Sequence, residues 1–125
     1  MNKDTKITLD ALLARKEQSK EDKNMKNRRE LYIPSLDGTI TIKPPTRATI
    51  SEAKDADNDA LADRYLVYEC IVEPDLKDKR LQEAYGCAEP DEIVDRIFEL
   101  GEVSKIALEC MDMAGFNNSV EAVKN

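Results

Sequence analysis

Residues 102–114 read EVSKIALECMDMA and carry the most regular hydrophobic pattern in the chain. Apolar side chains recur there every three or four residues, which places them on one face of an α-helix. Gly115 follows directly, and a glycine just past the last periodic residue commonly terminates a helix. The pattern therefore predicts a helix from about Glu102 to Ala114 with one face in a core. The residues on that face are Val103, Ile106, Ala107, Cys110, Met111 and Ala114.

A second helix is predicted from Asp59 to Glu73. Its apolar residues lie nearly all round the helix, which indicates a central and buried position. Asn58 and Asp59 are both suitable N-cap residues, and Asp59 is the preferred assignment. Pro74 is expected to stop the helix, because proline lacks a backbone N–H and its ring clashes with the preceding turn.

Shorter helices are expected on either side of this central one. A capping-box pattern at Thr49 opens a helix that fades near Asp57. Another is predicted over residues 76–85, closed by a glycine C-cap at Gly86. A third begins at Glu89-Pro90 and is expected to end at Gly101, because proline and acidic residues favour the first turn of a helix.

The only β signal lies between residues 31 and 42. Residues 31–34 and 39–42 alternate in hydrophobicity, and Asp37-Gly38 between them is a turn dipeptide. This pattern predicts a hairpin with Ile40 and Ile42 on one face. A lone hairpin is marginal in water, so this one is expected to lie against the helices.

The N-terminal segment predicts one more helix, over about residues 8–22. Thr8 is its expected N-cap, and Leu9, Leu12 and Leu13 form one short apolar stripe. From Arg15 to Arg29 every residue except Met25 is polar or charged, which fits either a solvated helix extension or a linker.

Together these patterns predict an α+β fold, mainly α: a small helical domain with one N-terminal β-hairpin packed on four to five helices. Three segments are expected within it. They are an N-terminal helix and charged arm (1–30), a globular body of hairpin and helical bundle (31–116) and a loose C-terminal tail (117–125).

Charge divides the chain unevenly. The net charge is −7 over 125 residues, made up of +4 to Arg47 (11 Lys+Arg less 7 Asp+Glu) and −11 from Ala48 onward (8 less 19). So acidic a body argues against nucleic-acid binding, because each phosphate contact needs a basic group. The simplest interpretation is a solvated surface that maintains solubility, and the alternative is an acidic surface that mimics DNA.

The residues needed for most catalysis are missing. The chain has no histidine, the commonest general base and metal ligand, and its four glycines are scattered too singly for a phosphate-binding loop. Residues 55–59 resemble the start of a calcium loop, but Ala60 stands where glycine makes the turn and Leu66 where a glutamate closes the site. No enzyme, cofactor or metal site is therefore expected, and the segment is interpreted as a junction between helices.

Compartment is predicted from what is absent. No apolar run approaches the roughly 20 residues that cross a bilayer, and residues 1–10 lack the apolar core of a signal peptide. Cys70, Cys87 and Cys110 are odd in number and widely spaced, so no disulfide framework is indicated; Cys70 and Cys110 are expected in the core. A cytoplasmic protein without membrane contact is expected.

Several phrases, taken in order, resemble the XkdN-like phage tail assembly chaperones. They are Leu9-Asp10-Ala11-Leu12-Leu13-Ala14-Arg15-Lys16, Asp37-Gly38-Thr39-Ile40-Thr41-Ile42, Leu81-Gln82-Glu83-Ala84-Tyr85, Glu89-Pro90 with Ile93-Val94 and Phe98, and Leu100-Gly101-Glu102. The resemblance covers nearly the whole chain and is weakest over residues 48–63. It implies a non-catalytic protein of the bacterial host cytoplasm that is absent from the finished virion. Such chaperones coat the tape measure protein and help tail tube subunits assemble around it, and in many phages a longer frameshifted form exists.

A chaperone of this kind needs apolar surface to shield an amphipathic helix and a charged exterior to keep the complex soluble. The predicted contact residues are Leu9, Leu12, Leu13, Leu108, Met111 and Met113. The competing interpretation is that these side chains are ordinary core. The tape measure protein is the expected partner, and the tail tube protein and a second copy of the chain (a homo-oligomer) are the further candidates. The alternative function is an acidic regulator or DNA mimic that inhibits a host nucleic-acid enzyme.

Overall fold

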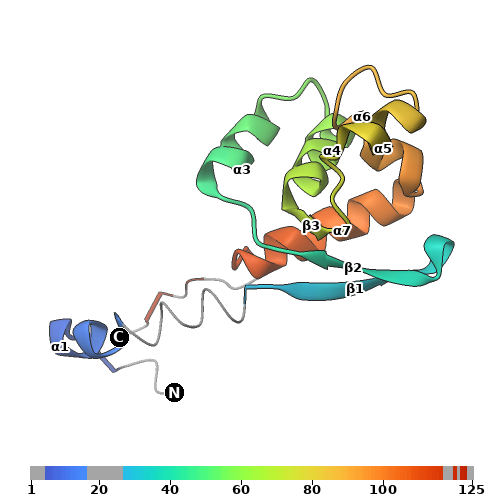
Figure 1. The fold of residues 1–125 in the computed structure, drawn as a ribbon. Coiled ribbons are helices and arrows are strands. Elements are labelled where there is room, and N and C mark those ends of the chain that lie inside the picture. The colour runs from blue at the N-terminus through green and yellow to red at the C-terminus, as the bar shows by residue number, and fades with distance from the viewer. Residues whose placement is uncertain (1–4, 17–26, 117–119, 121, 124–125) are drawn as a thin grey trace.

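The computed structural model describes residues 5–16, 27–116, 120, 122 and 123. The elements are α1 (Leu9–Ala14), β1 (Arg29–Ile33), the 3-10 helix η1 (Pro34–Leu36), β2 (Gly38–Ile42), α3 (Arg47–Lys54), α4 (Asp59–Cys70), β3 (Ile71–Glu73), α5 (Lys79–Ala84), α6 (Glu92–Ile97) and α7 (Leu100–Met113). The predicted class, α+β and mainly α, is confirmed (Figure 1).

The predicted hairpin is present and forms part of an antiparallel sheet with the order β1-β2-β3. Its strands are joined by η1 and by Asp37, which adopts a left-handed conformation with φ 48°. Ile40 and Ile42 share one face, as predicted, and are 4% and 0% exposed. This face is the one that the helices cover.

Residues 71–73 form strand β3, and the prediction that they extend the central helix is wrong. α4 ends at Cys70, and Ile71 is already extended with ψ 121°. β-branched residues suit a strand better than a helix, and here Ile71 pairs with Ile42 of β2. The backbone groups that a longer helix would have satisfied are instead used by the sheet.

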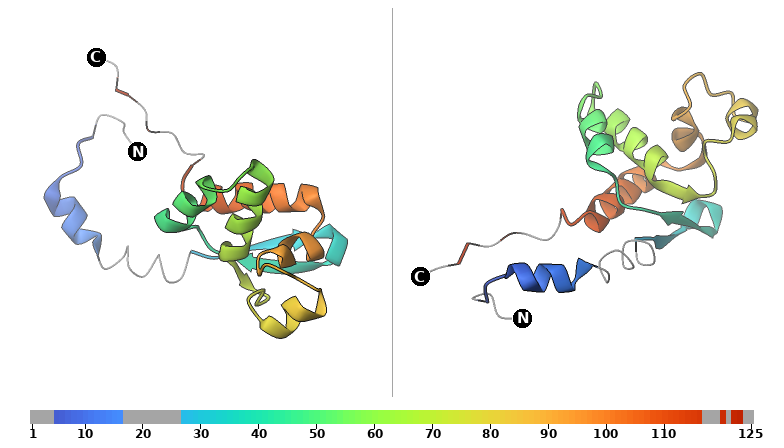
Figure 2. Two further views of the ribbon diagram at one scale, coloured as in Figure 1. Left: turned by 90° about the horizontal axis from the view of Figure 1, so that it is seen from above. Right: turned by 60° about the vertical axis from the view of Figure 1, so that its left-hand side comes forward.

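The body has two layers, with the sheet along one side and the helices α3 to α7 on the other (Figures 1 and 2). The long helix α7 runs next to the sheet, and α4 packs on both α7 and α6. Side chains from the two layers form one core. Its members are Ile33, Ile40, Ile42, Leu66, Val67, Cys70, Ile71, Leu76, Ile93, Val94, Phe98, Val103, Ile106, Ala107 and Cys110.

Two predicted helix caps are displaced. α3 begins at Arg47 and is capped by Thr46, not Thr49: the Thr46 hydroxyl accepts a hydrogen bond from the Thr49 backbone N–H at 3.1 Å. α4 is capped by Asn58, whose Oδ1 accepts from the Leu61 N–H at 2.9 Å, so the preference for Asp59 is wrong. In each case the oxygen three residues before the amide provides the cap.

A further correction concerns Gly101, which was predicted to end a helix. α6 ends earlier, at Ile97, and Gly101 lies in the first turn of α7. α7 is opened by a capping box in which the Glu99 and Glu102 side chains accept hydrogen bonds from each other's backbone. The helix ends at Met113, next to the predicted Ala114.

The glycine C-caps are confirmed at Gly86 and Gly115, which have φ of 68° and 89°. After α5, the Cys87 N–H donates to the Gln82 carbonyl and the Gly86 N–H donates to the Glu83 carbonyl. This is the Schellman arrangement, which favours glycine because an L side chain is strained at positive φ.

The N-terminal helix α1 is shorter than the predicted span of residues 8–22. Thr8 caps it as predicted, with its hydroxyl accepting from the Ala11 N–H at 3.2 Å. Residues 17–26 of the predicted extension lie outside the described residues. None of the residues of α1 is buried, and the helix stands apart from the body in each view (Figures 1 and 2).

Candidate functional site: an apolar groove between β1 and α7

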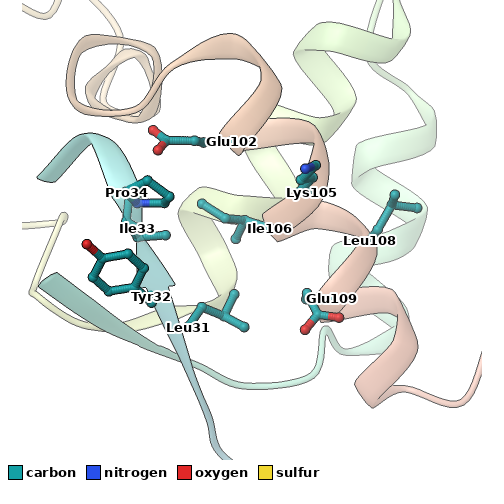
Figure 3. Close-up of a pocket in the computed structure, with 9 residues that line it drawn as sticks. All are labelled: Leu31, Tyr32, Ile33, Pro34, Glu102, Lys105, Ile106, Leu108 and Glu109. Atoms are coloured by element: carbon teal, nitrogen blue, oxygen red, sulfur yellow. The ribbon is translucent and has the colours of Figure 1, made fainter. Parts of the chain in front are cut away.

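The body carries a groove of about 400 Å³ between strand β1 and helix α7. Figure 3 shows the side chains of the strand on one side of the groove and those of the helix on the other. The lining residues are Leu31, Tyr32, Ile33, Pro34, Glu102, Lys105, Ile106, Leu108 and Glu109.

The inner part of this β1–α7 groove is formed by core residues. Ile33 and Ile106 line it and are 3% and 2% exposed. Its outer part is apolar but open to solvent, with Tyr32 59% and Leu108 66% exposed. Large exposed apolar side chains next to a formed hollow are typical of an interaction surface.

One end of the groove is closed by Glu102. Its carboxylate accepts hydrogen bonds from the Ser35 hydroxyl at 2.6 Å and from the Ser35 N–H at 3.1 Å. It also accepts from the Glu99 N–H at 3.0 Å. The bonds from Ser35, followed by that from Glu99, lower the pKa of Glu102, because they stabilise the carboxylate.

The other end of the groove is held by Arg29, the first residue of β1. Its Nη1 lies 3.0 Å from Asp112 Oδ2 and 3.4 Å from Glu109 Oε2. Arg29 therefore connects the start of the strand to the last turns of α7. Hydrogen bonds from Ser35 at one end and the Arg29 ion pairs at the other tie the hairpin to α7, and the groove lies between these two links.

A second hollow, of about 410 Å³, lies at the junction of α3 and α4. Ala53, Leu66 and Met111 line it, but its rim is acidic. Asp63 on this rim has a raised pKa, because burial and then the neighbouring Asp59 disfavour its charged form. The segment that resembled a calcium loop is this junction between helices. In the described part of the chain, no group of three or more possible ligand side chains could hold a metal ion.

The residues predicted to contact a partner do not form one surface. Leu108 lines the β1–α7 groove, Met111 lines the second hollow, and Met113 packs partly buried against the core. Leu9, Leu12 and Leu13 on α1 are 71%, 56% and 61% exposed. For all six residues, contact with a partner stays a prediction.

Three lining residues of the groove, Leu31, Tyr32 and Ile33, were not among the predicted contact residues. They lie on β1, which among the described residues has only β2 beside it in the sheet and is therefore an edge strand. An apolar edge strand is a recognised interaction site. The sequence showed the strand, but not that α7 lies close to it.

Across residues 5–16 and 27–116, no helix is long and apolar enough to span a bilayer. The fold and the groove define a small α+β domain with an apolar hollow between its edge strand and its long helix. The sequence profile of the phage XkdN-like tail assembly chaperone proteins matches residues 38–125, and the chain belongs to this family.

Among solved structures, the chain is similar to the crystal structure of the protein yqbN, with 22% identity and a TM-score of 0.54. The similarity covers 72% of this chain and 87% of that one, and it supports the fold. No curated protein matches the chain in sequence. Family membership gives the chain a role in phage tail assembly, implies that it binds phage tail proteins, and points to a non-enzymatic function.

Proposed function

We propose that this chain binds the tape measure protein, holding an apolar face of that protein in the β1–α7 groove while the tail tube is assembled. The observation that carries the proposal is the exposure of Leu108 and Tyr32 beside a formed apolar hollow. Tail tube subunits are the second proposed partner. The proposed place of action is the host cytoplasm.

The groove is suited to an amphipathic helix. About 10 Å of strand lines it from Leu31 to Pro34 at 3.3 Å per residue. About 10 Å of helix lines the other side from Glu102 to Glu109 at 1.5 Å per residue. A site of this length accepts about two helical turns, so each chain would cover a short piece of a long partner.

The surroundings of the groove favour reversible binding. Glu102, Lys105 and Glu109 place charges along its margin, where they stay solvated in a complex. Contacts that are apolar at the centre and charged at the margin supply modest affinity and maintain solubility. A chaperone that the tail tube must displace needs such modest contacts.

Among the sequence-predicted contact residues, Leu108 is the one that this proposal places in the groove. Leu9, Leu12 and Leu13 are proposed as a second contact on α1, because they are exposed and form one stripe. Met111 and Met113 are proposed as minor contributors, since both are partly buried against the core.

The test compares two exposed leucines on the same helix. Leu108 lines the groove and Leu100, which is 76% exposed, does not. Leu108→Gln should weaken binding of a purified tape measure segment about tenfold, because roughly 1.4 kcal/mol of apolar burial is lost in the complex. Leu100→Gln should bind as the unsubstituted chain does. The measurement is isothermal titration calorimetry at moderate salt.

Co-expression provides the second arm of the test. The tape measure protein should be recovered in the soluble fraction with the unsubstituted chain and should be largely insoluble with Leu108→Gln. Equal insolubility with and without the chain would remove the proposal. Binding to a basic host enzyme that weakens steeply with salt would favour the DNA-mimic alternative instead.

A further inference from the structure

We infer that, without a partner, α1 exchanges between the undocked position seen in Figures 1 and 2 and the β1–α7 groove of its own chain. The structure presents both surfaces uncovered: three leucines on α1 and an apolar groove on the body. The docking involves one chain only and does not depend on the proposed partner. Its consequence, that α1 must leave the groove before a tail protein can enter, rests on the proposed function.

The dimensions of the two surfaces match. α1 has six residues, which makes it about 9 Å long at 1.5 Å per residue. The groove is lined by about 10 Å of α7, from Glu102 to Glu109. Leu9, Leu12 and Leu13 fall on one face of α1, so one docked helix can cover all three.

The chain is long enough to allow this contact within one molecule. Lys16 and Arg29 are thirteen residues apart, so the segment between them can span up to about 43 Å. β1, which begins at Arg29, itself lines the groove from Leu31 onward. A short connection raises the effective concentration of the helix at the groove to the millimolar range, which favours its own body over a second copy.

The charges of the two surfaces also favour docking. The described N-terminal residues, 5–16, include Lys6, Asp10, Arg15 and Lys16, which give a net charge of +2 (3 less 1). With the Arg29 cluster at its end, the margin of the groove has three carboxylates (Glu102, Glu109 and Asp112) against two cations (Lys105 and Arg29), a net charge of −1 (2 less 3). The basic residues at the end of α1 would meet an acidic margin, and this attraction should weaken as salt is raised.

Chemical crosslinking in the full chain tests the inference. Asp10 lies beside the leucine stripe of α1, and Lys105 is an exposed residue lining the groove. In a Cys87→Ser background, Asp10→Cys and Lys105→Cys are combined and treated with a short bis-maleimide at low protein concentration. Cys70 and Cys110 are buried and should not react. The expected product is an intrachain link at monomer mass, detected by mass spectrometry.

The matched control moves the second cysteine away from the groove. Glu83 is exposed on α5 and does not line the groove. The Asp10→Cys, Glu83→Cys chain should give about tenfold less intrachain product if the effective concentration is high only at the groove. Adding Leu9→Gln, Leu12→Gln and Leu13→Gln to the groove pair should lower its yield to that of the control.

Three outcomes would overturn the inference: equal yields for the groove and control pairs, links formed mainly between chains, and an unchanged yield after removal of the three leucines. A tape measure segment that binds should reduce the intrachain yield, and an unchanged yield would exclude α1 as a cover of the partner site. Failure of the segment to bind at all would leave the crosslink intact, so the inference and the proposed function fail separately.

Discussion

The Ser35 hydroxyl donates a 2.6 Å hydrogen bond to the Glu102 carboxylate, 67 residues further along the chain. Ser35 lies in η1, between the strands of the hairpin, and Glu102 lies in the first turn of α7. The same carboxylate caps α7 through the Glu99 N–H. One side chain therefore starts the long helix and fixes the hairpin beside it, which sets one end of the β1–α7 groove.

The free energy of unfolding should fall in acid, because protonation of Glu102 weakens the hydrogen bonds that its carboxylate accepts. Hydrogen bonds from Ser35 and Glu99 lower its pKa below the ordinary value of 4.5, so the folded state favours the ionised form. The stabilisation is complete above about pH 4.5 and is lost as pH falls through the lower folded-state pKa. Glu102→Gln should therefore be less stable than the unsubstituted chain at pH 7, and the difference should shrink below pH 4.5. Urea denaturation across this pH range measures the difference in the free energy of unfolding between the two chains.

The control is Glu83→Gln, at an exposed position on α5. Its free energy of unfolding should differ from that of the unsubstituted chain by the same small amount at every pH.

Arg64 should contribute far more to stability than Arg80. Arg64 is 17% exposed, and its guanidinium lies 3.3 Å from both Asp91 and Asp95, which joins α4 to α6. Arg80 makes a 3.0 Å ion pair with Asp78 but is 92% exposed. Arg64→Gln should lower the free energy of unfolding by about 1–2 kcal/mol, and Arg80→Gln should leave it close to that of the unsubstituted chain. Similar losses in urea denaturation would mean that the link between α4 and α6 is not stabilising.

The start of α4 can be tested by removing each candidate cap. Asn58 Oδ1 accepts a 2.9 Å hydrogen bond from the Leu61 N–H, whereas Asp59 is the first residue of the helix. Asn58→Ala should cost about 1 kcal/mol, because one amide at the helix start loses its partner. Asp59→Ala should cost less, about 0.3–0.5 kcal/mol, because only its interaction with the helix dipole is lost. Thermal unfolding of both variants gives the comparison, and a reversed order would return the cap to Asp59.

Local patterns predicted the elements that depend on near neighbours in sequence. The periodicity of residues 103–114 was sufficient to find α7, and the alternation around Ile40 and Ile42 was sufficient to find the hairpin. Strand β3 was missed because its evidence is not local. Ile71 to Glu73 continue an apolar helical pattern, and their extended conformation depends on pairing with β2, about thirty residues earlier.

The groove was only partly predictable for the same reason. Leu108 stands out in sequence because it lies off the buried stripe of α7, and it does line the groove. Leu31 and Tyr32 carry no such signal, because their proximity to α7 depends on the Ser35–Glu102 and Arg29–Asp112 links between distant parts of the chain. Met113 was grouped with Leu108 by residue type, but it packs against the core. Among apolar side chains, tertiary packing decides which individual ones stay exposed, and residue type alone does not show this.

Two glycine substitutions should change stability in opposite directions. An added Cβ at either Gly86 or Gly101 would meet no other atom within 4 Å, so the backbone decides the effect. Gly86 has φ 68°, where an L side chain is strained, and Gly86→Ala should cost about 1–2 kcal/mol. Gly101 lies in the first turn of α7 without a positive φ, and Gly101→Ala should stabilise by about 0.4–1 kcal/mol, because the unfolded chain loses freedom. Urea denaturation measures both effects. If the dependence of the unfolding free energy on urea concentration is unchanged, a shifted midpoint reports a change in stability. If Gly101→Ala were destabilising instead, Gly101 would be a helix terminator, as its sequence context suggests, and α7 would begin after it.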